Sequence, residues 1–400
     1  MKKRLLFVME SMKGEGGERS LLTLLQLTDY DKYDVDLMLF EPSGLFFDMI
    51  PEQVNVISFG ELYDKFTKPM VKSVISLLLS GKPVLAIKRA LYSRTVNSSE
   101  KSSLIRDQRA WKYMKSFFSD TAKEYDAAIG YLEGKPNFYV ADCARAKQKI
   151  AYIHNDYRKL EMDPAADSIF FSKLDYIVTV SEECEKVLHE IFPQYSEKIL
   201  MIENVNMQEI LVKMSQEKAE GFEKNSSTKM LLTIGRLSPQ KGYDIAIDAA
   251  EILSKKGYDF KWLSIGKGEL MEEMKDRISE KNLQEKFIFL GEKANPYPYL
   301  AGCDIYVQPS YFEGKSIAID EAKCFAKPIV TTKFTTVYDQ LADGETAILA
   351  EINAASVAEK IEQLFNDEKL AEKLTENLKK IKHGNEEEIQ KFYALFGEKI

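Results

Sequence analysis

The stretch that decides the fold reads Ser310-Tyr-Phe-Glu-Gly-Lys-Ser-Ile-Ala-Ile-Asp-Glu-Ala-Lys323 and lies in the last third of the chain. The residues before it, 304–309, alternate apolar and polar side chains and end at a proline, a pattern that predicts a β-strand. Residues 316–325 are good helix formers without a breaker, so a helix is expected after the loop. Strand, loop and helix in this order are typical of an α/β sheet.

The loop and the helix bring two carboxylates to a run of backbone amides. Glu313 lies in the loop, and Glu321 lies about two turns into the helix. The N–H groups of the residues that open the helix are expected to be unpaired, which suits an anion; these residues are Gly314, Lys315, Ser316 and Ile317. Carboxylates for sugar hydroxyls beside a phosphate-sized site suggest a nucleotide-sugar, although an ordinary strand–loop–helix with solvated glutamates fits this stretch equally well.

A second loop, Gly235-Arg-Leu-Ser-Pro-Gln-Lys-Gly242, follows a predicted strand at 230–234. It carries Arg236 and Lys241, a planar bidentate donor and a compact point charge, which together suit a diphosphate. Ligands in open α/β sheets bind outside the carboxyl ends of the strands, which favours this interpretation over plain surface charge. Gly268 and Gly291 also follow predicted strands, where their backbone could approach a ligand.

Strands alternate with helices along both halves of the chain, which predicts parallel sheets covered by helices on both faces. Since 400 residues exceed one comfortable core, two domains are expected. Periodicity weakens between 204 and 229, and the boundary is placed there. The predicted domains are 1–205 and 206–380, with a helical tail at 381–400. Predicted strands are 3–9, 34–40, 54–58, 127–131, 149–154, 176–180, 199–202, 230–234, 261–265, 287–290, 304–309, 328–332 and 347–350.

Two features of the first half are candidates for a ligand site. The strand at 3–9 is followed by a glycine-rich turn with Gly16 and Gly17, whose backbone could approach a ligand, although the spacing does not fit GxGxxG. His154 ends another strand, where it could hydrogen-bond a substrate hydroxyl or phosphate, whereas a lone histidine is usually structural.

The composition narrows the class of protein. A net charge of −8 disfavours nucleic acid as a partner, and no apolar run approaches the ~20 residues of a membrane span. The four cysteines and three histidines are scattered, which argues against a zinc site and a disulfide framework and fits a reducing cytoplasm. Neither a metal nor a cofactor is expected. The N-terminus does not fit a signal peptide, and a cytoplasmic protein is expected. Asp34-Val35-Asp36 matches a metal-binding DxD pair, and chance explains it best.

One segment departs from this acidic average. Residues 65–115 hold twelve basic and two acidic side chains, a net charge of +10, interleaved with apolar residues. A basic helical stretch with an apolar face suggests docking on an anionic membrane surface, in which case the protein would be peripheral on the inner face of the cell membrane. Two amphipathic packing helices with a solvated basic face explain the pattern equally well.

Taken together, these motifs resemble retaining glycosyltransferases of family 4, of bacterial capsule or exopolysaccharide type. The resemblance rests on GGER at 16–19, GRLSPQKG at 235–242, IGKGEL at 265–270 and EGKSIAIDEA at 313–322, in this order. It implies the GT-B fold, with two Rossmann-like doubly wound domains facing a central cleft. Lys315 and Ser316 depart from the aromatic or small residue and the Gly or Pro that are common in the family, which leaves the sugar unassigned.

The resemblance also implies roles for single residues. Arg236 and Lys241 would neutralise the donor diphosphate, as a metal does in the DxD class. Glu321 would bind the ribose and Glu313 the hydroxyls of the transferred sugar, with the amides after Gly314 beside them. From the first domain, His154 would lie by the sugar, and Gly16 and Gly17 by the diphosphate or acceptor. Transfer would occur on the front face, without a protein nucleophile.

The expected activity is transfer of a sugar from a nucleotide-sugar, with uridine diphosphate as the expected nucleotide, to a saccharide or lipid-linked acceptor. Capsule, exopolysaccharide or teichoic acid would be the product. A protein-glycosylating transferase, a non-catalytic GT-B subunit that recognises glycan, and an epimerase on the same fold are the alternatives. The retained Glu313, Glu321, Arg236 and Lys241 argue against the non-catalytic subunit.

Overall fold

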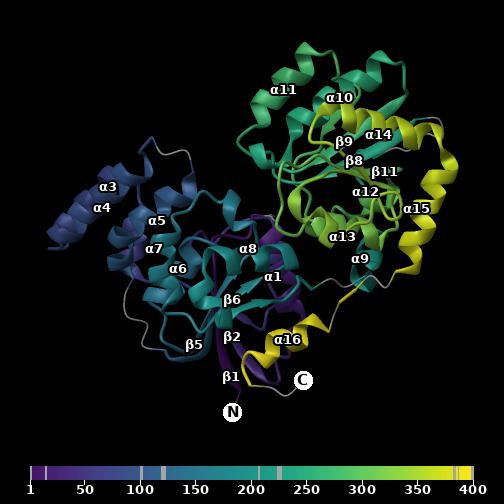
Figure 1. Ribbon diagram of the computed structural model, residues 1–400. Coiled ribbons are helices and arrows are strands. Elements are labelled where there is room, and N and C mark those ends of the chain that lie inside the picture. Colours follow the sequence, from purple (N-terminus) through teal and green to yellow (C-terminus); the bar gives the residue numbers. More distant parts are fainter. Residues whose placement is uncertain are drawn as a thin grey trace. The chain divides into compact units, whose positions relative to one another are not determined.

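A computed structural model describes residues 2–13, 16–99, 102–118, 123–205, 208–222, 228–381, 384–385 and 387–397. The chain divides into two compact units (Figure 1). Unit 1 comprises Met1–Lys13, Gly17–Glu203 and Ile389–Ile400, and unit 2 comprises Gly14–Gly16 and Asn204–Glu388. Each unit is built on one parallel sheet with helices packed against it, so the predicted pair of Rossmann-like domains is confirmed.

The sheet of unit 1 has seven strands in the order β3-β2-β1-β4-β5-β6-β7. All of its neighbours pair in parallel. The strands are β1 Lys3–Met9, β2 Tyr33–Leu39, β3 Val54–Ile57, β4 Tyr125–Gly130, β5 Ala146–Ile153, β6 Tyr176–Thr179 and β7 Ile199–Met201. Both faces of such a sheet are covered, which explains why β1 is an almost unbroken run of buried apolar residues. Its helices are α1 Gly16–Leu27, α2 Glu61–Thr67, α3 Met70–Leu79, α4 Pro83–Val96, α5 Ser103–Met114, α6 Lys135–Asp142, α7 Pro164–Phe171 and α8 Glu182–Ile191.

The sheet of unit 2 has six strands in the order β10-β9-β8-β11-β12-β13, again parallel throughout. The strands are β8 Lys229–Ile234, β9 Phe260–Ile265, β10 Phe287–Phe289, β11 Ile305–Gln308, β12 Ile329–Thr332 and β13 Ile348–Ala350. Apolar cores lie on both faces of the sheet. The helices are α9 Gln208–Met214, α10 Tyr243–Lys255, α11 Met271–Glu280, α12 Tyr297–Gly302, α13 Ile317–Cys324, α14 Ala354–Asn366 and α15 Glu368–Lys380.

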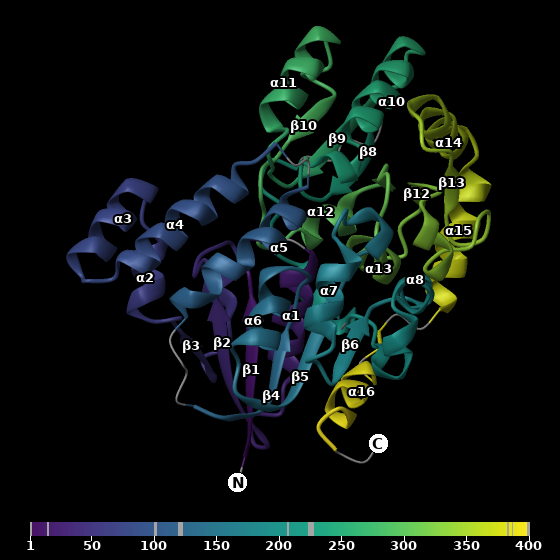
Figure 2. The same ribbon diagram turned by 60° about the vertical axis from the view of Figure 1, so that its left-hand side comes forward.

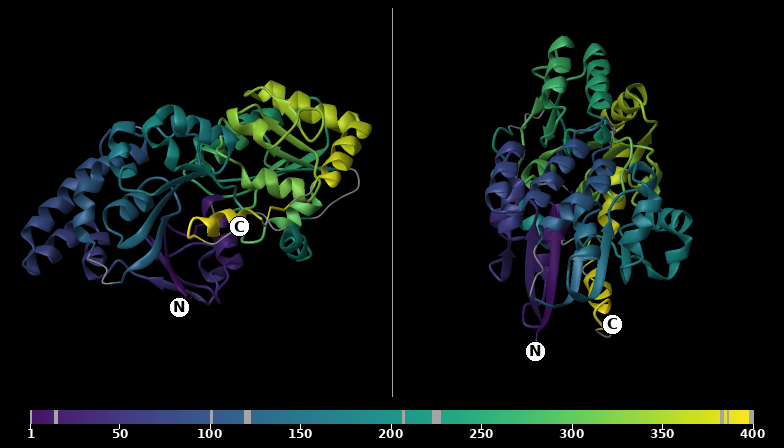
Figure 3. Two further views of the ribbon diagram at one scale, coloured as in Figure 1. Left: turned by 60° about the horizontal axis from the view of Figure 1, so that its bottom comes forward. Right: turned by 90° about the vertical axis from the view of Figure 1, so that its left-hand side faces the viewer.

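The last helix, α16 (Glu388–Ala394), packs on strands from the other end of the chain (Figure 3). The ring of Phe392 stacks on Phe7 of β1 at 6.0 Å, and Tyr393 stacks on Tyr33 of β2 at 5.0 Å. The Tyr393 hydroxyl also accepts a hydrogen bond from the Asp29 amide at 3.0 Å. The C-terminal residues therefore complete the core of unit 1.

Three local predictions need correction. The helical pattern of residues 107–123 predicts a helix over that range, but the helix there, α5, begins earlier at Ser103 and ends at Met114, and residues 119–122 lie outside the described part of the chain. The sequence also predicts a helix at 337–341, where the structure has a 3-10 turn at Thr335–Asp339. The basic segment 65–115 contributes to four helices, α2 to α5, rather than two. Pro69 separates α2 from α3, and Gly81-Lys82-Pro83 separates α3 from α4.

The DxD match has a structural explanation. Asp36 is buried within β2 and accepts hydrogen bonds from Lys123 at 2.5 Å and from the Tyr125 hydroxyl at 2.6 Å. The amide of Asn55 donates a third at 3.0 Å. Since these donors satisfy the carboxylate, the pair is not a metal site, as its chance interpretation predicts.

Candidate active site

Three loops interlock at the carboxyl edge of the unit 2 sheet, after β8, β9 and β11. A Cβ at Gly242 would lie 2.0 Å from the carbonyl oxygen of Pro309, and Gly242 has a left-handed φ of +63°. A Cβ at Gly266 would lie 1.9 Å from the carbonyl oxygen of Gly235. These contacts leave no room for a side chain, so glycine allows the loops to approach closely and hold one another in place.

The first loop and the loop after β11 meet at a buried ion pair. The Nζ of Lys241 lies 2.7 Å from Oε1 and 2.9 Å from Oε2 of Glu313. The Glu313 side chain is 6% exposed and that of Lys241 is 23% exposed. The stem of Lys241 lies along Gly235, where a Cβ would meet it at 3.4 Å. The structure therefore joins two predicted site residues that are 72 positions apart.

Further donors fix the orientation of the Glu313 carboxylate. Its Oε1 accepts hydrogen bonds from Ser310 Oγ at 2.6 Å and from Gln308 Nε2 at 2.8 Å. Gln308 is itself oriented by the Tyr306 hydroxyl, which donates to its Oε1 at 2.6 Å. Because all of these groups are buried, the network holds the Glu313 carboxylate rigidly as a hydrogen-bond acceptor.

The second predicted carboxylate lies on α13. Glu321 is buried and accepts a hydrogen bond from the Tyr297 hydroxyl at 2.9 Å. Burial, with the charges of Glu321 and Glu313, raises the pKa of Tyr306 well above its usual value.

The start of α13 corrects one prediction. The helix runs from Ile317 to Cys324 with Ser316 as its N-cap, as the pattern predicts, and the Ser316 hydroxyl accepts from the Ile319 amide at 3.4 Å. The Ser316 amide, however, is not unpaired: it donates to Oε1 of Gln340 at 2.8 Å. Gln340 also donates to the Ser316 carbonyl at 2.9 Å, so a side chain distant in sequence clamps this turn.

The remaining predicted residues of unit 2 occupy the same edge of the sheet. Arg236 is exposed directly after β8, and Gly314 is buried between Glu313 and a half-buried Lys315. A Cβ at Gly268 would lie 2.2 Å from the carbonyl oxygen of Leu237, so this glycine packs on the loop of Arg236. Gly291 follows β10 with a φ of +71°, and its carbonyl accepts from the Gly266 amide at 3.0 Å.

In unit 1, His154 directly follows β5 at the carboxyl edge of the sheet. It is buried between the rings of Tyr131 and Tyr152, at 5.2 and 5.6 Å. Burial lowers the pKa of His154, and the nearby Glu133 only partly opposes that effect, so the ring is neutral near pH 7. Its Nε2 is buried and has no hydrogen-bond partner among the described residues.

Glu133 supports this histidine and is not apparent in the sequence. Its Oε2 accepts from the backbone amide of His154 at 3.0 Å, and its Oε1 accepts from the Asn155 side chain. Because it lies on the loop after β4, Glu133 connects the ends of two neighbouring strands. Gln308 and Ser310 are equally absent from the prediction, although polar residues at the end of an apolar strand are a usable signal.

The glycine-rich turn after β1 is described from Gly16 onwards, and Gly14 and Glu15 lie outside the described residues. Gly16 and Gly17 open α1, and a Cβ at Gly17 would lie 3.2 Å from Cδ1 of Leu132. Glu18, in the first turn of α1, is buried and accepts from Ser11 Oγ at 2.5 Å. This contact ties the start of the helix to the turn that follows β1.

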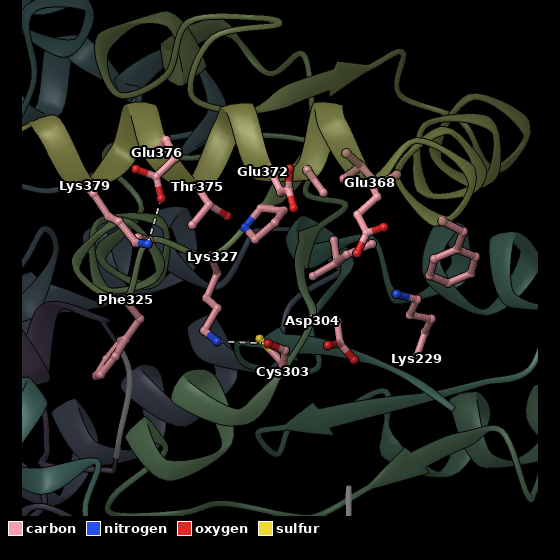
Figure 4. Close-up of a pocket in the computed structure, with 16 residues that line it drawn as sticks. Lys229, Cys303, Asp304, Phe325, Lys327, Glu368, Glu372, Thr375, Glu376 and Lys379 are labelled. Atoms are coloured by element: carbon pink, nitrogen blue, oxygen red, sulfur yellow. Dashed lines mark hydrogen bonds and ion pairs between the residues drawn. The ribbon is translucent and has the colours of Figure 1, made fainter. Parts of the chain in front are cut away.

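A hollow of about 750 Å³ lies at the opposite edge of the unit 2 sheet (Figure 4). It is lined by residues at the amino ends of strands, including Lys229, Asp304 and Lys327, and by α15. The ammonium group of Lys327 donates to the carbonyl of Cys303 at 3.0 Å. Ligands of such sheets bind at the carboxyl edge, so this hollow is not the candidate active site.

Comparison with known proteins agrees with this geometry. Residues 214–381 match the family model described as "Glycosyl transferases group 1". A Campylobacter jejuni protein, N-acetylgalactosamine-N,N'-diacetylbacillosaminyl-diphospho-undecaprenol 4-alpha-N-acetylgalactosaminyltransferase, is 24% identical over 364 residues, which are 90% of this chain and 89% of that protein. The capsular polysaccharide biosynthesis glycosyltransferase CapM of Staphylococcus aureus is 30% identical over 158 residues, 37% of this chain and 39% of CapM.

The fold also matches solved structures. The crystal structure of Anabaena Alr3699/HepE in complex with UDP and glucose superposes with a TM-score of 0.71, at 16% identity, over 99% of both chains. The resemblance to bacterial polysaccharide glycosyltransferases and the assignment to the GT-B fold class are thereby confirmed.

Proposed function

Since residues 214–381 match the model of group 1 glycosyl transferases, we propose that the chain is a retaining glycosyltransferase that uses a UDP-sugar. Its acceptor is a saccharide or a lipid-linked saccharide in the assembly of a bacterial cell-surface polysaccharide. The name of the Campylobacter relative includes a diphospho-undecaprenol, which is a lipid carrier, and this supports a lipid-linked acceptor. The UDP and glucose in the Anabaena structure support the donor class.

The buried pair of Glu313 and Lys241 is the observation that carries this proposal. In the donor complex, Lys241 neutralises the diphosphate together with Arg236, while Glu313 accepts hydrogen bonds from hydroxyls of the transferred sugar. Glu321 does the same for the ribose. Groups that are already oriented and desolvated stabilise developing charge on the leaving phosphate without reorganising, which is the main source of rate in such sites. The two cations take the place of a metal ion, so the reaction proceeds without one.

Retention in this proposal follows from transfer on the front face, with the leaving phosphate helping to deprotonate the acceptor. Glu313 supports the absence of a protein nucleophile, because its Oε1 accepts from Lys241, Gln308 and Ser310 and its Oε2 from Lys241. A carboxylate engaged in this way is a weak nucleophile. His154, which is neutral, offers its Nε2 to the sugar as a hydrogen-bonding group rather than as an acid.

A thermal-shift screen against a panel of nucleotide-sugars tests the donor. A ligand at about 100 times its dissociation constant stabilises the folded state by about 2.7 kcal/mol, which raises the melting temperature measurably. We expect a UDP-sugar to raise the melting temperature of the unmodified chain. The same UDP-sugar should have little effect on the melting temperature of the Lys241→Ala variant. A panel that leaves the melting temperature unchanged would overturn the proposal. Product NMR then reports whether the anomeric configuration is retained, and the same assay with EDTA tests metal independence.

A further inference from the structure

Two neighbouring helices of unit 1, α3 and α4, present apolar side chains to solvent. Eight of the fifteen large hydrophobic residues that are exposed in the described part of the chain lie between Met70 and Leu91. Leu79 is 85% exposed, and Val71 and Val84 are 63% and 64% exposed. The apolar surface consists of Met70, Val71, Ile75, Leu78, Leu79, Val84, Ile87 and Leu91.

The spacing shows that this surface is a continuous face of each helix. In α3, exposed Val71 is followed four residues later by Ile75, and Ile75 is followed three and four residues later by two exposed leucines. In α4, the exposed residues are three and then four positions apart. Both spacings are those of an apolar stripe along one face of a helix. The two helices lie side by side, joined by the turn at 80–82 (Figure 2). A patch of this kind on a monomer marks an interaction surface.

The opposite face of the two helices already packs within unit 1. Leu77 and Ala86 are buried in the core cluster of that unit. Arg89 donates from Nε to the Phe66 carbonyl at 2.9 Å, and its guanidinium lies 4.8 Å from the centre of the Phe66 ring. These contacts hold α3 and α4 by their inner face, so the apolar outer face is not needed for folding.

The charge around this face is predominantly positive: Glu61 of α2 pairs with Lys65 at 2.7 Å, but neither α3 nor α4 contains an acidic residue. Residues 65–99 contain seven basic side chains and no acidic one, although the chain as a whole has a net charge of −8. Three of the seven, Lys65, Lys88 and Arg89, donate hydrogen bonds within unit 1. Lys68, Lys72 and Arg94 are exposed beside the apolar stripes.

This charge identifies the occupant. If a second copy of the chain docked face to face, the basic side chains of α3 and α4 would oppose those of the partner, and neither helix carries a carboxylate to pair with them, which is unfavourable. A bilayer with anionic headgroups accepts the apolar side chains at the acyl boundary and the ammonium groups at the phosphates. Among the described residues, no helix is long and apolar enough to span a membrane. We propose that the α3–α4 face docks the protein on an anionic lipid bilayer.

Co-sedimentation of the full chain with vesicles tests this docking face. The vesicles are phosphatidylcholine alone or mixed with phosphatidylglycerol, at low and at high salt. We expect the unmodified chain to bind the anionic vesicles at low salt. The triple variant Ile75→Ser/Leu79→Ser/Ile87→Ser should bind them at least about 10-fold more weakly, because the apolar area that is buried in the bilayer is lost. The variant Lys68→Gln/Lys72→Gln/Arg94→Gln should lose most of the preference for phosphatidylglycerol and of the salt dependence.

Ile169→Ser is the matched control, because Ile169 is 61% exposed on α7 of the same unit and lies outside the face. It should bind like the unmodified chain, and melting curves should show that all variants are folded. Wild-type protein that ignores anionic vesicles, or that binds neutral vesicles equally well, overturns the proposal. The proposal is also overturned if light scattering shows that the unmodified chain is a dimer and that the triple serine variant is a monomer. Donor binding in the thermal-shift screen is independent of each of these results.

Discussion

At the residue scale, Glu313 and Lys241 hold each other at the carboxyl edge of the unit 2 sheet, and removing one leaves the other buried without its charge partner. We expect Glu313→Ala and Lys241→Ala each to lower kcat/KM at least about 100-fold, the cost of one preorganised electrostatic group. The double variant Lys241→Ala/Glu313→Gln should recover stability but not activity, because the buried charge is gone and the donor contacts are still missing. Steady-state kinetics and melting curves measure both.

Lys261→Ala is the control for these variants, since Lys261 is exposed in β9 away from the loops. It should keep wild-type kinetics. Turnover near the wild-type rate in Glu313→Ala would remove this carboxylate from the proposed site.

His154 carries a pH prediction. Burial lowers the pKa of His154 in the folded protein, so below its ordinary value near 6.5 the unfolded chain binds a proton that the folded chain does not. The stability that neutral His154 contributes is present above that pH and is lost as the pH falls toward the lowered pKa. We expect the melting temperature to fall between about pH 7 and pH 5, and less steeply for His154→Asn.

His189→Asn, on α8, controls for the removal of one histidine. If the melting temperature fell with pH equally steeply in His154→Asn and in the wild-type protein, the buried ring would have no proton-linked role in stability.

At the scale of the element, the turn between β8 and α10 depends on one glycine. In Gly242→Ala the new Cβ would lie 2.0 Å from the Pro309 carbonyl oxygen, at a φ of +63° that L-residues avoid. We expect a loss of more than about 2 kcal/mol of stability and weaker donor binding, because the loop of Lys241 must move away from the loop of Glu313. Chemical denaturation and the thermal-shift assay measure the two effects.

Gly257 provides a matched control at the other end of α10. Its φ is +84°, but a Cβ there would meet nothing within 4 Å. Gly257→Ala should therefore cost only the backbone strain of about 1–2 kcal/mol and leave donor binding unchanged. Equal effects of the two substitutions would show that the contact with Pro309 has no role in the site.

At the scale of the whole molecule, the chain's last helix completes the core of its first domain. Phe392 is 1% exposed and stacks on Phe7. We expect Phe392→Ala to destabilise unit 1 by about 3 kcal/mol, since a buried aromatic ring is replaced by a cavity. Each unit has one tryptophan, Trp111 or Trp262, so in a Trp262→Phe background the fluorescence reports on unit 1 alone.

Gln390→Ala, exposed on the same helix, should leave that transition unchanged. If Phe392→Ala did the same, α16 would be an accessory to the fold of unit 1 rather than part of its core.

The sequence by itself was sufficient for the architecture, and it supplied most residues of the candidate site. Buried parallel strands are nearly continuous apolar runs, which made β1 recognisable in the sequence. The alternating pattern that ends at Pro309 did the same for β11. Glu313, Glu321, Arg236 and Lys241 also stand out, because charged groups directly after apolar strands, or early in the helix that follows, lie where such sheets bind ligands.

Only the tertiary structure decided how these groups are arranged. Lys241 pairs with Glu313, which is 72 positions away in the sequence. Gln340 accepts a hydrogen bond from the amide of Ser316, 24 positions away. Glu133 accepts one from the amide of His154, 21 positions away. The sequence likewise did not predict that the apolar stripes of α3 and α4 face solvent. An amphipathic helix has the same sequence pattern whether its apolar stripe packs on a core or is exposed. The physical reason is common to these cases: local patterns report on burial and period, whereas partners are chosen by strand order and loop packing, which no local pattern encodes.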